Sequence, residues 1–271
     1  MPPLFPLTLS LYAAACALYC VAVSQALPPL LYRAARGCLL LALVSQAADI
    51  GWLCLHGQPP PTDAREAVFF ISWLMVGVYL LATLRTPLPV VAALLLPVSM
   101  VLQVAARLAP AGAPEAHSLL RSLHVLSASL GTAILALGAG GSVVYLLLER
   151  QLKRHHLSPL GRRGPPLQTL DTLNRRTTLL GFPVFTLALV TGAAFLARQL
   201  YEGIPLRSVL ARPQYVLALL SWLLFASLLL GRVTAGLRGR RAALLTLCGF
   251  GAVLAVLTLY YLRGLTGGGA P

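Results

Sequence analysis

The sequence predicts an all-α polytopic membrane protein, a bundle of about eight transmembrane helices with both termini outside. Of its 271 residues, 58% are hydrophobic and only 10% are charged, whereas soluble domains carry about a quarter charged residues. The apolar residues fall in continuous blocks, and about 20 such residues are needed to cross a bilayer. Continuous blocks also argue against a β-barrel, because barrel strands alternate apolar and polar residues.

Each span is placed as an apolar run bounded by charges, proline or glycine. Residues 1–26 resemble a signal peptide, but no Lys or Arg precedes their apolar core, so we expect them to stay as the first span. The chain is expected to form one integral membrane domain over residues 1–271. The eight spans are predicted at residues 4–27, 37–55, 67–84, 88–108, 119–148, 177–197, 214–231 and 242–262.

The basic residues are distributed unequally between the two sides of the predicted bundle. The loops after spans one, three, five and seven hold 14 of the 21 Lys and Arg residues, and the opposite side holds seven. The positive-inside rule makes the first side cytoplasmic. The richest part is a basic cytoplasmic loop at 149–176, where leucines at spacing three within Pro166–Arg176 predict a short interfacial helix on the inner leaflet.

The net charge of +14 indicates contact with membrane lipid rather than with nucleic acid. The charges lie in loops between spans, where they meet anionic headgroups. No basic stripe interleaved with aromatic residues is present, so no nucleic acid is expected as a partner.

Several kinds of chemistry are not expected of this chain. Its five cysteines contain no Cys-x-x-Cys pair, which argues against a thiol–disulfide relay or a zinc site. No nucleophile–base pair is recognisable, so we do not expect a free-standing enzyme. Asp49, near the outer end of span two, is expected to be solvated, because it lies only about two turns from the boundary.

One face of span five combines a histidine with small side chains. His124, Ser127, Ala128 and Gly131 share this face of the helix. Small residues allow another helix or a flat ligand to approach closely. Two interpretations of His124 stay open: a metal ligand, or an interfacial histidine that hydrogen-bonds a neighbouring helix or water.

An ordered series of short motifs runs through nearly the whole chain. Leu123-His124-Val125 lies near the start of span five, and Tyr145 to Lys153 follows the pattern Tyr-Leu-x-x-Glu-x-x-Leu-Lys. In order and spacing the motifs resemble the cytochrome c assembly superfamily, the haem-handling membrane proteins of CcsA, CcmC and HemX type, and most closely its smaller HemX-like or YpjD-like members. The other motifs are Pro61-Thr62, Glu66, Trp73, Pro165-Pro166-Leu167, Gly181-Phe182-Pro183, Thr191-Gly192, Trp222, Arg238-Gly239-Arg240-Arg241 and Gly249-Phe250.

The resemblance implies a bacterial inner-membrane protein that binds or presents haem at the outer face in support of cytochrome c assembly. Its partners would be other cytochrome c assembly or membrane proteins. His124 would ligate the haem iron and Arg121 would meet a propionate. His56, at the outer end of span two, is the candidate second ligand. His117 is not, because it lies seven residues before His124 on the same helical face.

The small side chains of span five would then form the wall of the haem pocket. The residues involved are Ser127, Ala128 and Gly131, which lie one and two turns below His124. A bulky residue at Gly131 is expected to exclude the ring. Gly131→Ala is expected to be nearly silent.

The chain also lacks parts of the family pattern. The loop from Phe195 to Gln214 has neither the tryptophans nor the Trp-Asp end of the family's haem exporters. Gln46 and Leu230 stand where typical members have histidines, and no histidine follows span eight. The alternative is therefore a haem-free membrane accessory or regulatory protein that acts through partner contacts. A transporter driven by Asp and His ranks third, because no acidic pair lies deep in the spans.

The split of basic residues generates a topology prediction. A reporter fused after Pro271 is expected to be active only outside the cytoplasm, and cysteines placed at positions 158–164 are expected to react only from the inside. A fusion that is active only in the cytoplasm would overturn the assignment.

Overall fold

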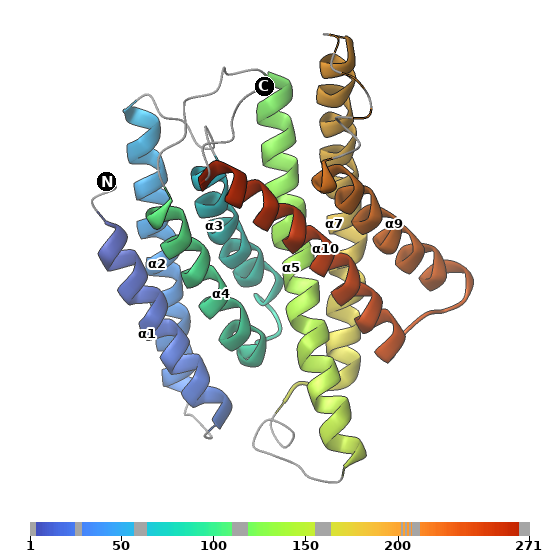
Figure 1. Cartoon of the computed structure of the whole chain (residues 1–271). Coiled ribbons are helices and arrows are strands. Elements are labelled where there is room, and N and C mark those ends of the chain that lie inside the picture. Colours follow the sequence, from blue (N-terminus) through green and yellow to red (C-terminus); the bar gives the residue numbers. More distant parts are fainter. Residues whose placement is uncertain are drawn as a thin grey trace.

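The computed structural model is an all-helical bundle (Figure 1), which confirms the predicted all-α class, whereas the outward orientation of the termini stays a prediction. It describes residues 4–24, 29–56, 64–109, 119–154, 164–201, 203, 205, 207 and 212–265. Within these residues, eight helices are long and apolar enough to cross a membrane. They are α1 (Phe5–Ser24), α2 (Pro29–Leu55), α3 (Ala64–Ala82), α4 (Pro89–Leu108), α5 (Leu119–Lys153), α7 (Leu167–Tyr201), α9 (Pro213–Thr234) and α10 (Gly239–Leu265).

Helix α5 is the centre of the bundle. It lies between the group α1–α4 on one side and α7 and α9 on the other (Figure 1), and it packs against α3, α4, α7 and α10. Helices that are consecutive in the chain pack as the pairs α1–α2, α3–α4, α5–α7 and α9–α10. The start of α1 and the end of α10 lie at the same end of the bundle (Figure 1).

The predicted interfacial helix within Pro166–Arg176 is wrong. These residues form the first turns of α7, which begins at Leu167 and continues without a break to Tyr201. Leu170 and Leu173 are only 1% and 8% exposed. The leucine spacing therefore marks a face buried against other helices, rather than a face lying on lipid.

The predicted basic loop at 149–176 is also shorter than expected. Helix α5 continues to Lys153, so residues 149–153 are helical, and α7 accounts for 167–176. Positions 158–163, proposed above for labelling, lie outside the described residues.

Glycines on α5 allow the neighbouring helices α4 and α7 to pack close to its backbone. A Cβ at Gly141 would lie 3.0 Å from Leu173 of α7, and one at Gly140 would lie 3.3 Å from Leu95 of α4. The neighbouring side chains occupy the space that larger residues would fill. Small residues of this kind let helices approach closely in a membrane, where packing replaces the hydrophobic effect.

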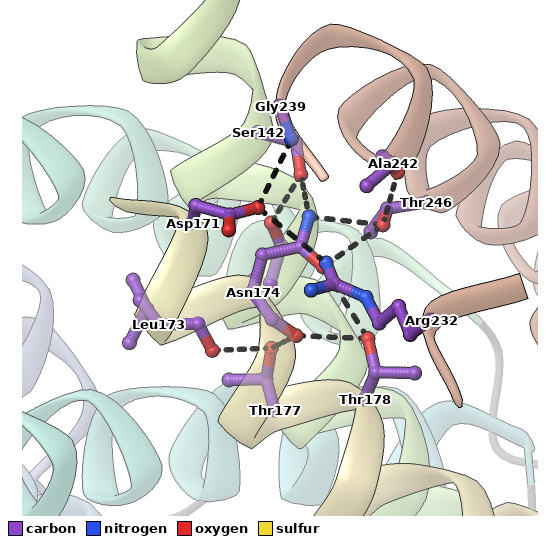
Figure 2. Close-up of polar contacts among 11 residues, drawn as sticks. Ser142, Asp171, Leu173, Asn174, Thr177, Thr178, Arg232, Gly239, Ala242 and Thr246 are labelled. Carbon is purple, nitrogen blue, oxygen red and sulfur yellow. Dashed lines mark hydrogen bonds and ion pairs between the residues drawn. The ribbon is translucent and has the colours of Figure 1, made fainter. Parts of the chain in front are cut away.

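A buried polar cluster joins four helices at one end of the bundle (Figure 2). Asn174 of α7, 3% exposed, donates from Nδ2 to Ser142 Oγ of α5 at 2.5 Å and to Thr246 Oγ1 of α10 at 2.9 Å. Arg232 of α9 donates from Nη2 to Asn174 Oδ1 at 2.9 Å. Asp171 accepts a hydrogen bond from Gly239 N at 3.3 Å. A single amide therefore connects α5, α7, α9 and α10.

A second buried polar network joins α1, α2 and α3. Gln46 is 0% exposed and accepts a hydrogen bond from the Tyr12 hydroxyl at 2.8 Å. Its Nε2 donates to Phe69 O at 3.1 Å and to Ser72 Oγ at 2.9 Å. The amide therefore uses both donors and one acceptor inside the bundle, as a buried polar group requires.

Asp49 is not solvated as the sequence suggested. Its side chain is 0% exposed, and Oδ1 accepts a hydrogen bond from Leu4 N at 3.0 Å. The residue lies near the end of α2, but α1 packs against α2 and covers the carboxylate.

Removing the Thr246 hydroxyl is expected to destabilise the bundle. Thr246→Val keeps the shape of the side chain but leaves the buried amide of Asn174 without one acceptor, at a cost of about 1 kcal/mol. Thr258→Val, at an exposed position of the same helix, is the matched control and is expected to change little. Thermal unfolding in detergent measures both, and equal melting temperatures would contradict a stabilising role of the cluster.

Candidate functional site

His124 lies in the second turn of α5, and its ring contacts α7. The side chain is half-buried. Its Nδ1 lies 2.9 Å from Ala188 O and 3.2 Å from Thr191 Oγ1. The histidine is therefore tied to the neighbouring helix through one ring nitrogen.

These contacts determine which nitrogen of the neutral imidazole carries the proton. The carbonyl oxygen of Ala188 can only accept a hydrogen bond, so Nδ1 is the donor. Nε2 then holds a lone pair, and it makes no hydrogen bond to any described residue. An imidazole that donates from one nitrogen to a backbone carbonyl and keeps the other nitrogen unprotonated is oriented as a metal-ligating histidine is.

The second side of the imidazole is shaped by Gly192 and Phe195 of α7. A Cβ at Gly192 would lie 3.1 Å from His124 Cε1, so a side chain there would crowd the ring. The Phe195 ring meets the imidazole edge-on, with centroids 6.0 Å apart. Thr191 and His124 are 67 residues apart in the sequence. The Thr191-Gly192 motif and the His124 motif thus contact each other in the folded protein.

The contact residues on α7 were not predicted as site residues. Ala188 contributes only a backbone carbonyl, which carries no sequence signal. Thr191 and Gly192 were recognised as a motif, but no role was inferred for them. Their proximity to His124 depends on the register of α5 against α7, which a single sequence does not reveal.

The small face of α5 packs against α7. A Cβ at Gly131 would lie 3.1 Å from Phe185 N and 3.2 Å from its Cα. Ser127 is 6% exposed and donates to Leu123 O at 2.6 Å. In this structure these residues allow a helix to approach, and the space beside Gly131 is filled by the backbone of α7.

Of the other predicted site residues, those on α5 lie within about one turn of His124, whereas His56 does not. Ala128 is half-buried on α5, and Arg121 lies one turn before His124. His56 is exposed at the end of α2, where its ring lies over Trp52 with centroids 4.1 Å apart. Since α2 packs mainly on α1 and α3, the described structure does not bring His56 to His124. His117 lies outside the described residues.

The two positions where the family pattern has histidines take other roles here. Gln46 is part of the buried network with Tyr12 and Ser72. Leu230 of α9 is 63% exposed and faces away from the bundle. Neither side chain can therefore replace a histidine as a metal ligand.

Two further motif pairs meet in space. Trp222 of α9 lies over Phe182 of α7 with ring centroids 5.6 Å apart, and its Nε1 donates to Thr186 Oγ1 at 3.0 Å. A Cβ at Gly239 would lie 3.0 Å from the Tyr145 hydroxyl oxygen. Motifs that are far apart in the sequence thus stabilise the packing of α5, α7, α9 and α10.

The close contact at Gly131 predicts that Gly131→Ala destabilises the packing of α5 on α7, whereas its nearly silent effect on haem binding stays a prediction. The added methyl group would meet the backbone of α7, which cannot rotate away, and overpacking of this kind costs about 1–3 kcal/mol. Gly251→Ala is the matched control, because nothing lies within 4 Å of a Cβ there. We expect a lower melting temperature in detergent for the first variant only. Two unchanged melting temperatures would contradict the packing role of Gly131.

Comparison with known proteins places these motifs in a family. The chain is 28% identical over 265 residues to cytochrome c biogenesis protein CcsA of Synechococcus elongatus, and the alignment covers 79% of this chain and 80% of that protein. It is 29% identical over 227 residues to protein HemX of Brevibacillus brevis, covering 81% and 83% of the two chains. No solved structure matches it. The family model described as cytochrome c assembly protein matches residues 62–266, and the chain therefore belongs to this family.

Proposed function

We propose that this protein handles haem in support of cytochrome c assembly, by binding or presenting haem at the outer face of the membrane. One observation carries the proposal within this family: His124 donates from Nδ1 to Ala188 O at 2.9 Å, which leaves Nε2 with a lone pair. A neutral imidazole in this state can ligate haem iron. The bound haem would supply the redox-active iron.

The surrounding residues support this role by holding the ring. Thr191 and Gly192 act as positioning residues, because one contacts Nδ1 and the other leaves space for the ring. Arg121, one turn before His124, is the proposed propionate partner. Since the backbone of α7 already fills the space beside Gly131, haem would approach His124 from the Nε2 side.

The setting of the site is part of the same proposal. We place the protein in the bacterial inner membrane, with both termini and His124 on the outer side, on the basis of the uneven distribution of basic residues. Other cytochrome c assembly proteins are the proposed partners. The role is one of assembly rather than free-standing catalysis.

The test is the absorbance of the purified protein after haem loading. Wild type is expected to show a Soret band with one haem per chain, and His124→Gly is expected to lose most of it. Millimolar imidazole should restore binding to His124→Gly, because the free base can occupy the vacated position. Gly192→Ala is expected to weaken binding roughly tenfold, by displacing the ring.

His56→Ala is the control histidine variant and is expected to bind haem as wild type does. A loss on His56→Ala equal to that on His124→Gly would instead indicate a second ligand from α2. Equal Soret bands in wild type and His124→Gly would remove His124 from the mechanism.

A haem-free accessory or regulatory role is the second candidate. The observation that favours it is Gln46, which fills a family histidine position with an amide fully engaged by Tyr12, Phe69 and Ser72. A wild-type protein that takes up no haem would leave this function in first place.

A further inference from the structure

We propose that a groove between the end of α5 and the start of α10 binds the headgroup of an anionic phospholipid. The inference is independent of haem. The groove is lined by Leu146, Glu149, Arg150, Lys153, Arg240 and Leu244.

The groove carries a net positive charge, which favours binding of an anion. Lys153 Nζ lies 2.8 Å from Glu149 Oε1, so these two charges compensate each other within one helix. Arg150 and Arg240 come from different helices and both are exposed. Neither guanidinium group makes a hydrogen bond or ion pair with another described residue. Two guanidinium groups that face one groove repel each other, and a phosphate between them removes the repulsion through charge-assisted hydrogen bonds.

The apolar part of the groove suits an acyl chain. Leu146 and Leu244 line it beside the arginines, and Leu244 is 43% exposed. On both helices the charged residues lie where the apolar run ends, Arg150 near the end of α5 and Arg240 near the start of α10. This is the depth at which headgroups lie, and basic pockets between helices at that depth bind anionic lipids.

The groove is held in shape by the polar cluster of Figure 2. Asp171 accepts a hydrogen bond from Gly239 N at 3.3 Å, next to Arg240. Asp171 also lies 3.8 Å from the guanidinium of Arg232, which in turn binds Asn174. The start of α10 is thereby anchored to α7, which fixes the backbone next to Arg240 before a lipid arrives. Preorganisation of this kind lowers the entropic cost of binding.

Native mass spectrometry of the delipidated protein tests the proposal. Wild type is expected to retain one phosphatidylglycerol at concentrations where it retains no phosphatidylcholine. Arg150→Gln/Arg240→Gln is expected to weaken this binding about tenfold or more. The matched control is Arg33→Gln/Arg85→Gln, which removes the same charge from two other exposed positions and should bind as wild type does.

A second measurement separates lost binding from lost structure. Phosphatidylglycerol is expected to raise the melting temperature of wild type and of the control, but not of Arg150→Gln/Arg240→Gln. Arg150→Lys/Arg240→Lys keeps the charge and should retain most of the binding. Equal phosphatidylglycerol retention in all variants, equal retention of both lipids by wild type, or displacement of the lipid by millimolar inorganic phosphate would each overturn the proposal.

Discussion

The close contact between α5 and α7 is the interaction on which the rest of the structure depends. Glycines at 131 and 141 let α7 approach to within side-chain distance of the α5 backbone. At one end of this contact His124 reaches Ala188, and at the other end Asn174 reaches Ser142. In lipid, where apolar contact alone gives no preference for one partner, such fit and a few hydrogen bonds decide which helices associate.

The same contact explains the role of the small residues of α5. A row of small side chains below a histidine is compatible with a flat ligand or with a second helix. Here α7 occupies the space beside Gly131, and in return it supplies the carbonyl that orients His124. The glycines therefore support the histidine indirectly, by allowing α7 to reach it, and the face of His124 that stays available is the one bearing Nε2.

Each half of the bundle contains a buried amide that is hydrogen-bonded within that half. Gln46 connects α1, α2 and α3, whereas Asn174 connects α5, α7, α9 and α10. Buried amides of this kind specify which helices meet, because an unpaired amide in an apolar environment is costly. The second cluster also reaches the charged end of α10, where Asp171 accepts a hydrogen bond from Gly239 N, next to the exposed Arg240.

The sequence by itself determined the eight helices, because long apolar runs have few alternatives in a membrane, and it singled out His124 and the motifs that identify the family. It did not determine that the leucines of 167–176 are buried, that Asp49 is covered by α1, or that Thr191 and Gly192 hold His124. Those features depend on which helix faces which, and at what register. Only tertiary packing decides this, because lipid and a neighbouring helix are equally apolar, and a row of small residues does not say which helix packs against it.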